Sequence, residues 1–280
     1  MDSKILSIIG LNKKTAYNPT VPFKHNNKEY IGLRVESLSS ELDSKIMFAF
    51  KNNDEWVIES SSFALQDPAL MQISGKLLLA GVYVEKFGKG LRWKTDFYYG
   101  ADISNMEKIA SGPWGMKDIR LVDLKDRIGV FTRPQNKQFR KGKIGYLEIN
   151  SLDELASVDW HSASILEGLF DNNSWGGVNQ ALRISDSKIG VIGHEAYADK
   201  KGKHYSAMSF VFDANTREYS DYKIIARRSD FPLSLSKRSP ELDDILFPAG
   251  ITNVKNKFVD LYVGISDYCC GKIRIRNPFG

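Results

Sequence analysis

The residues best suited to chemistry are carboxylates and cations that stand at matching positions of five similar segments. Asp67 and Asp118 each begin one segment. The cations that recur at a common distance after a segment start are Arg34, Arg133 and His194. A pair of carboxylates can supply the proton donor and the second group that cleavage of a glycosidic bond requires, and charged groups gathered in a concave site are those whose pKa values shift toward acid–base use. Asp67 and Asp118 are therefore the candidate catalytic residues.

The five segments form an internal repeat of a strand, a tight turn and a second strand. They span residues 18–37, 67–85, 118–134, 179–197 and 247–267. The turn pairs fall at nearly the same offset in each segment and are Asn27-Lys28, Gly75-Lys76, Asp126-Arg127, Ser187-Lys188 and Asn256-Lys257. Gly, Asn, Asp and Ser tolerate the backbone angles of tight hairpin turns. The segment starts are about 50 to 70 residues apart, which suits four-stranded blades joined by loops.

Five such hairpins predict an all-β fold, namely a five-bladed β-propeller that takes in residues 1–280 as one domain. The outer strands of the blades are expected from further strand-like stretches, which include Lys45–Phe50, Lys143–Ile149 and Tyr205–Phe212. Helical periodicity is scarce, and Leu152–Ala156 is expected to make a single helical turn.

The repeat also predicts a ring of side chains around one rim of the propeller axis, because the first residue of a hairpin and the last lie at the same end. Its predicted members are Asn18, Arg34, Asp67, Val82, Asp118, Arg133, Asn179, His194, Phe247 and Val263. The residues slightly further along the same edge are Glu36, Tyr83, Glu195 and Asp267. A ring with carboxylates, arginines and a histidine predicts a polar pocket for one small ligand. The candidate substrate-binding residues are Asn18, Arg34, Glu36, Asn179, Glu195 and Asp267.

Each of these residues also has a structural interpretation. An Asp or Asn at a strand start often caps a turn through its own side chain, and a lone histidine is as often a structural residue as a ligand contact. The common offset of Arg34, Arg133 and His194 favours a shared site, because unrelated caps need not collect cations at one offset.

The charge balance is only mildly basic. The chain has 39 Lys and Arg against 34 Asp and Glu, a net charge of +5 and a sequence pI of about 8.9. The tightest basic clusters, Lys137–Lys143 and Lys200–Lys203, are short and contain a glycine, so we interpret them as solvated turns. A nucleic-acid surface would need a longer basic stripe with interleaved aromatic residues. No nucleic-acid partner is expected.

The cysteines and the apolar segments argue against a disulfide-bonded, zinc-binding, membrane-spanning or secreted protein. Cys269 and Cys270 are adjacent and have no further partner for a loop-closing disulfide or a zinc site, so we expect them in the core or at a strand end. No stretch approaches the roughly 18 apolar residues that a membrane helix requires. The apolar run Ile5–Ile9 is not followed by a small-residue cleavage site. The sequence therefore predicts a cytoplasmic protein with no membrane partner, no metal and no cofactor.

Short motifs in these segments resemble, in order and spacing, those of the inverting β-mannoside phosphorylases and β-mannosidases. That family consists of five-bladed propellers related to the furanosidase-type glycoside hydrolases, and the resemblance covers roughly residues 15–275. The matching motifs are Asn18-Pro19, Arg34-Val35-Glu36, Asp67-Pro68, Lys117-Asp118, Arg133-Pro134, His194, Phe247-Pro248-Ala249-Gly250 and Tyr262 to Asp267.

The resemblance implies roles for several residues. Asp67 corresponds to the family's general acid, and Lys117, Arg133 and His194 correspond to positions that hold inorganic phosphate, which requires fixed positive charge and donors. The family's arginine after the Asp-Pro pair is Ala69 here. The chain thus resembles a divergent branch, and the resemblance does not fix the sugar.

Two hypotheses follow for the function. In the first, the protein cleaves a glycosidic bond of an oligosaccharide or other glycoside, inverting by resemblance, with Asp67 as the proton donor, either directly or through a sugar hydroxyl. Attack by phosphate would use the phosphate-binding positions, whereas attack by water would need a second carboxylate. The candidates for that carboxylate are Asp118, Glu36 and Glu195. In the second hypothesis, the propeller binds a glycan or a protein without catalysis.

Overall fold

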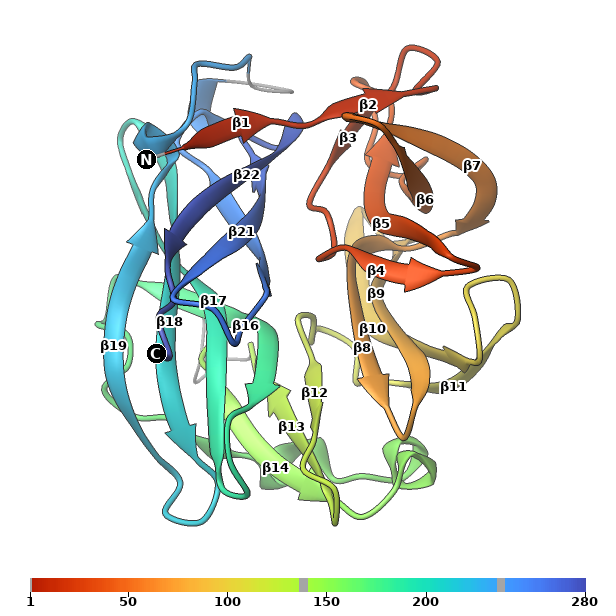
Figure 1. Cartoon of the computed structure of the whole chain (residues 1–280). Helices are drawn as coiled ribbons and strands as arrows, with labels where there is room; N and C mark the ends of the chain where they lie inside the picture. The colour runs from red at the N-terminus through yellow and green to blue at the C-terminus, as the bar shows by residue number, and fades with distance from the viewer. Residues whose placement is uncertain (1, 136–140, 236–239) are drawn as a thin grey trace.

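Five β-sheets stand around a central axis like the blades of a propeller (Figure 1). The structure is a computed structural model that describes residues 2–135, 141–235 and 240–280. The predicted all-β, five-bladed propeller is confirmed, and each predicted hairpin supplies the inner strands of one blade.

The strands are given from the axis outward. In blade 1, the innermost strands β3 (Thr15–Tyr17) and β4 (Phe23–His25) both pair with β5 (Lys28–Glu36). The strands β6 (Lys45–Asn52), β7 (Glu55–Phe63) and β2 (Ser7–Ile9) follow outward. Blade 2 contains β8 (Gln66–Ile73), β9 (Lys76–Phe87), β10 (Gly90–Gly100) and β11 (Met106–Ser111). Blade 3 contains β12 (Arg120–Asp123), β13 (Ile128–Thr132), β14 (Gly145–Ile149) and β15 (Ser164–Ile165).

The last two blades follow the same order. Blade 4 contains β16 (Trp175–Arg183), β17 (Lys188–Asp199), β18 (Gly202–Asp213) and β19 (Glu218–Ala226). Blade 5 contains β20 (Leu246–Thr252), β21 (Phe258–Ile265), β22 (Cys269–Arg276) and β1 (Ser3–Ile5). Short 3-10 helices lie in the connections and are η1 (Leu152–Ala156), η2 (Trp160–Ser162), η3 (Arg228–Asp230) and η4 (Pro240–Leu242).

The smaller sequence predictions are also met where the structure describes them. The predicted outer strands fall in β6, β14 and β18, and the single helical turn is η1. Cys270 is buried and Cys269 begins β22. Residues 200 and 201 form the turn between β17 and β18, whereas residues 137–140 of the other basic cluster lie outside the described residues.

The N-terminal segment joins the first and last blades. β1 pairs with β22 through Ser3 opposite Ile273, and β2 then runs parallel to β7 in blade 1. Figure 1 shows this segment crossing from one blade to the other. The pairing covers the outer edges of both sheets, which would otherwise present unpaired backbone groups.

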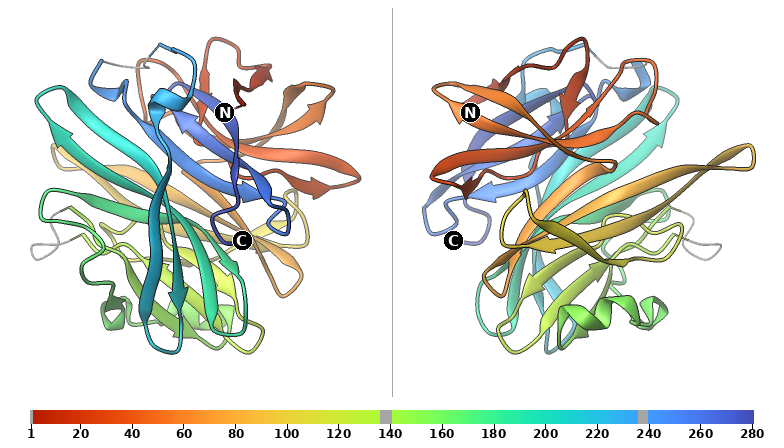
Figure 2. Two further views of the ribbon diagram at one scale, coloured as in Figure 1. Left: turned by 60° about the vertical axis from the view of Figure 1, so that its left-hand side comes forward. Right: turned by 90° about the vertical axis from the view of Figure 1, so that its right-hand side faces the viewer.

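Apolar side chains fill each gap between neighbouring blades, and Figure 2 shows the sheets stacked face to face around the axis. Between blades 3 and 4, Phe212 packs against Tyr146 and Phe131 with ring centroids 4.6 and 5.5 Å apart. Full burial of such a side chain contributes about 1.5–3 kcal/mol. The packed gaps hold the inner strands rigidly and therefore fix the rim residues.

In every blade the backbone is irregular within the innermost strand or just before it. Asn18, Asp67 and Asp118 have positive φ values of 46°, 49° and 59°, and the pairing register shifts next to Asn179 in blade 4 and Ala249 in blade 5. A positive φ outside glycine is tolerated best by Asn and Asp. The residue type at these strand starts is therefore set partly by the backbone.

Gly264 provides a test of how closely blades 1 and 5 approach. A Cβ atom on Gly264 would lie 2.0 Å from Asn18 Oδ1 and 2.7 Å from its backbone nitrogen. We expect Gly264→Ala to lower the free energy of unfolding by about 1–3 kcal/mol, because the added methyl group displaces rim backbone. Denaturant unfolding measures this. The matched control is Gly90→Ala, where a Cβ meets no atom within 4 Å and φ is ordinary; equal effects of both changes would contradict the packing.

Candidate active site

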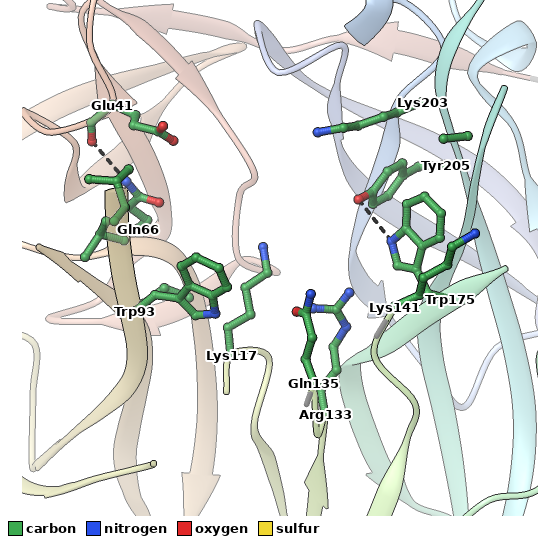
Figure 3. A pocket seen from close by; sticks show the side chains of 14 residues that line it. Glu41, Gln66, Trp93, Lys117, Arg133, Gln135, Lys141, Trp175, Lys203 and Tyr205 are labelled. Atoms are coloured by element: carbon green, nitrogen blue, oxygen red, sulfur yellow. Dashed lines mark hydrogen bonds between the residues drawn. The ribbon is translucent and has the colours of Figure 1, made fainter. Parts of the chain in front are cut away.

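A cavity with two connected compartments lies at the rim where the predicted ring stands. The inner compartment, about 310 Å³, is lined by Asn18, Arg34, Asp67, Leu242, Ile245, Phe247 and Asp267. The outer compartment, about 490 Å³, is lined by Val82, Val84, Leu91, Trp93, Arg133, Gln135, Lys141, Trp175 and Ala198. The residues common to both are Glu41, Gln66, Lys117, Lys203 and Tyr205. Figure 3 shows the outer compartment with its side chains converging from blades 1 to 4.

Asp67 presents one carboxylate oxygen to its neighbours and leaves the other available. Its Oδ1 accepts hydrogen bonds from Asn18 Nδ2 at 2.8 Å and Arg34 Nη1 at 3.1 Å. Its Oδ2 has no hydrogen-bond partner among the described residues. Because Asp67 lines the inner compartment, Oδ2 is the atom that can meet a ligand.

The surrounding cations determine the ionisation of Asp67. Burial alone would raise the pKa of this carboxyl, but the positive charges of Arg34 and Lys117 outweigh burial and hold the pKa below its usual value. The hydrogen bond from Asn18 acts in the same direction. With the cavity free of anions, Asp67 is therefore a carboxylate at neutral pH.

Arg34 is held in place by a second carboxylate behind it. Glu36 Oε2 accepts from Arg34 Nε at 2.9 Å, and Glu36 Oε1 accepts from the Tyr17 hydroxyl at 2.7 Å. Glu36 is fully buried and lines neither compartment. Its contacts orient Arg34 toward Asp67.

Asp118 lies behind the cavity wall. Its carboxylate is 3.5 Å from Arg133 Nη1 and 3.6 Å from Arg120 Nη2, and its exposed fraction is 2%. Burial would raise its pKa, yet the positive charges of Lys117, Arg133 and Arg120 lower it to about 2. Asp118 therefore stays ionised and holds cations, and it borders neither compartment.

Two of the predicted phosphate-binding cations do line the cavity. Arg133 is fixed by a hydrogen bond from Nε to the Gly176 carbonyl oxygen at 2.7 Å and by Asp118. Lys117 borders both compartments, and its ammonium group has no hydrogen-bond or ion-pair partner among the described residues. A half-buried cation without a partner is a ready site for an anion.

His194, the third predicted phosphate contact, is buried behind the same wall. Its Nδ1 pairs with Asn179 Oδ1 at 2.8 Å, and its ring lies 5.6 Å from Tyr205 and 4.9 Å from Phe247 between centroids. Burial lowers its pKa to about 3, so the imidazole is neutral at pH 7. Neither His194 nor Asn179 lines the two compartments.

The last two predicted binding residues have different surroundings. Asp267 lines the inner compartment and, with a φ of 47°, is held in a left-handed conformation. Glu195 accepts a hydrogen bond from the hydroxyl of Tyr222 on β19, the outermost strand of its blade. The Glu195 side chain is therefore directed away from the cavity, as expected for the neighbour of His194 in a strand.

Several lining residues were not predicted from the sequence. They are Glu41, Gln66, Trp93, Lys141, Trp175, Lys203 and Tyr205. Gln66 and Trp175 lie close to predicted ring positions, so a wider window around each strand start would have included them. Lys203 belongs to a cluster interpreted as a solvated turn; it is exposed but also reaches the cavity.

The described residues contain no cluster suited to a metal ion. In ranges 2–135, 141–235 and 240–280, no group of three His, Cys, Asp or Glu side chains is placed to hold a metal ion. No helix of the described chain is long and apolar enough to cross a membrane.

Comparison with known proteins places this chain in a family. The model of a family described as "Protein of unknown function (DUF1861)" matches residues 1–280. The chain belongs to the DUF1861 family. No curated protein is significantly similar in sequence.

The solved structures include close relatives of this DUF1861 protein. A mannose phosphorylase from Leishmania mexicana, MPT-4, in complex with a phosphate ion, is 34% identical with a TM-score of 0.92, over 100% of this chain and 89% of that chain. MPT-1, a GDP-Man-dependent mannosyltransferase from the same organism, is 34% identical with a TM-score of 0.90, over 100% and 90%. The predicted kinship with mannoside phosphorylases is thus confirmed, and these relatives support a carbohydrate-active enzyme of the glycosyl-transferring kind.

A more distant structure has the same fold. Zg3597, a family 117 glycoside hydrolase from Zobellia galactanivorans, is 9% identical with a TM-score of 0.58, over 99% of this chain and 90% of that chain. At that identity the likeness concerns the propeller fold alone.

The buried His194 predicts a specific pH dependence of stability. In the unfolded chain His194 becomes protonated below its ordinary pKa of 6.5. In the folded protein it becomes protonated only near pH 3. The free energy of unfolding should therefore fall with decreasing pH in this window, by up to about 1.4 kcal/mol per pH unit from this group. His194→Gln should flatten the dependence measured by denaturant unfolding, and His161→Gln, at an exposed site, should not. An unchanged slope in His194→Gln would contradict the neutral buried imidazole.

Proposed function

We propose that the protein is a glycoside phosphorylase that transfers a mannosyl unit from a glycan to inorganic phosphate. The observation that carries the proposal is the Lys117 ammonium group, which has no hydrogen-bond or ion-pair partner among the described residues, borders both compartments and acts electrostatically on Asp67. Arg133 lines the outer compartment and adds a second fixed cation. The phosphate-bound mannose phosphorylase at 34% identity supports both the nucleophile and the sugar.

Asp67 is proposed as the proton donor. Its free oxygen, Oδ2, borders the compartment, while Asn18 and Arg34 hold Oδ1. Phosphate bound beside Lys117 would bring negative charge and oppose the cation that lowers the Asp67 pKa. The pKa of Asp67 should rise when phosphate binds, because a nearby negative charge disfavours the ionised form. Phosphate binding thus helps to supply the protonated acid.

The proposed reaction is a single displacement. The Oδ2 proton moves to the glycosidic oxygen, directly or through a hydroxyl of the sugar, and the bond from that oxygen to the anomeric carbon breaks. A phosphate oxygen uses its lone pair to form a new bond to the same carbon from the opposite side, which inverts its configuration. The products are a sugar 1-phosphate and a glycan shortened by one unit.

The positions of the three carboxylates predicted as general bases support phosphate over water as the nucleophile. Water would need a general base, and the three residues predicted for that role, Asp118, Glu36 and Glu195, border neither compartment. Each is engaged with an arginine or a tyrosine. The cations predicted for phosphate are better placed, since Lys117 and Arg133 both line the cavity.

The proposal predicts phosphate-dependent release of sugar 1-phosphate from manno-oligosaccharides. Asp67→Asn should lower kcat by about a hundredfold or more, the contribution of a positioned general acid. A coupled assay of sugar 1-phosphate measures both the phosphate dependence and the loss of kcat in Asp67→Asn. Gluco- and galacto-oligosaccharides serve as comparison substrates. Equal turnover without phosphate would indicate a hydrolase. Transfer from GDP-mannose without any phosphorolysis would indicate a transferase, and binding without turnover would indicate the non-catalytic propeller.

Replacement of Lys117 tests the phosphate site separately. Lys117→Met should raise the KM for phosphate about tenfold to a hundredfold, because a hydrogen bond to a charged group contributes about 1.5–3 kcal/mol. Lys45→Met, at an exposed residue of β6 that lines neither compartment, is the matched control and should leave KM unchanged. A Lys117→Met enzyme with the wild-type KM for phosphate would contradict this assignment.

A further inference from the structure

Trp93 has an indole N–H group and an aromatic ring that form no hydrogen bond and no ring contact with the described residues. Its indole Nε1 is buried and has no hydrogen-bond partner among the residues that the structure describes. Buried tryptophan N–H groups normally find an acceptor. The Trp93 ring also makes no aromatic stacking or cation–π contact with any residue in the described part of the chain. Since Trp93 lines the outer compartment, a ligand there can supply what the ring lacks.

Trp93 is held firmly enough to serve as a binding surface. It lies on β10, where it pairs with Val84 of β9, and its carbonyl oxygen accepts a hydrogen bond from Gly115 at 2.7 Å. Val84 and Leu91 line the cavity beside it. The ring therefore stands on a paired strand rather than on a loop, which reduces the cost of ordering it when a ligand binds.

A second tryptophan stands on the opposite side of the outer compartment (Figure 3). Trp175 begins β16, and its Nε1 donates to the Tyr205 hydroxyl at 3.4 Å. The Tyr205 ring meets the Trp175 ring edge to face, with an interplanar angle of 84°. Lys141 lies over the Trp175 ring at 5.5 Å and is tethered to the Asn173 carbonyl oxygen at 3.1 Å. Trp175 is thus already oriented in the absence of a ligand.

We propose that Trp93 and Trp175 form a second sugar-binding site, which holds units of the glycan beyond the two that are joined by the cleaved bond. The inference rests on the proposed function and places the transferred sugar in the polar inner compartment around Asp67. A pyranose ring has an apolar C–H face that packs on an indole and a rim of hydroxyl oxygens that can accept from Trp93 Nε1. The preferred substrates are therefore oligosaccharides of at least three units rather than disaccharides.

Binding can be measured without turnover by titrating manno-oligosaccharides of two to five units into the enzyme in phosphate-free buffer. Calorimetry should give tighter binding for three or more units than for two. Trp93→Ala should weaken binding of the longer chains about tenfold, which corresponds to about 1.4 kcal/mol, and should change disaccharide binding less than about twofold. Trp93→Phe keeps a ring but loses the N–H, so its effect on the longer chains should be intermediate.

Trp114→Ala is the matched control, because Trp114 is an exposed tryptophan that lines neither compartment. It should not change the dependence on chain length. Equal weakening of all chain lengths by Trp93→Ala, or no weakening at all, would overturn the inference. The inference would also be overturned if GDP bound in a Trp93-dependent way and none of the oligosaccharides bound. Chain-length-dependent binding through Trp93, together with no turnover when phosphate is added, would uphold this site and refute the proposed phosphorylase.

Discussion

The buried ion pairs around the propeller axis are the constraint on which the site depends. One set joins Glu36, Arg34 and Asp67, with contacts of 2.9 and 3.1 Å. The other joins Asp118 to Arg120 and Arg133 at 3.6 and 3.5 Å. Removing one member of such a buried pair costs about 3–5 kcal/mol, because the remaining charge is left without a partner. The charges at the axis can therefore be buried only as complete sets.

This pairing separates structural charges from reactive ones. Glu36 and Asp118 are used to hold arginines, and His194 is neutral and packed between aromatic rings. Among the charged groups that face the cavity are Asp67 Oδ2 and the Lys117 ammonium group, neither of which has a hydrogen-bond partner among the described residues. An acid with one free carboxylate oxygen and a cation without a partner among the described residues, on one cavity, are the elements that acid-assisted transfer to an anion requires.

The sequence predicted the propeller because the signal was repeated. Five hairpins with turns at nearly the same offset define five blades even though each hairpin alone is weak evidence. The common offsets within the repeat also predicted which residues lie at the same end of the propeller axis. Asn18, Arg34 and Asp67 are in contact there, as expected. The irregular backbone at the strand starts accounts for the recurrence of Asn and Asp there.

Register could not predict the depth at which each side chain lies. His194 and Glu195 are adjacent in sequence, yet one packs behind the cavity wall and the other contacts the outermost strand of its blade. Trp93 escaped prediction because it comes from β10, the third strand of its blade, which carries no repeated motif. Lys203 escaped it because a turn lysine at a blade edge has no sequence feature that distinguishes a cavity rim from open solvent.

The central claim is that an anion beside Lys117 controls the ionisation of Asp67. The most direct measurement is a carbon-13 NMR titration of the Asp67 carboxyl, assigned with Asp67→Asn, in the absence and presence of saturating phosphate. The account predicts a pKa below the ordinary aspartate value in the free protein and a higher pKa with phosphate bound. A pKa that is unchanged or falls when phosphate binds would contradict it.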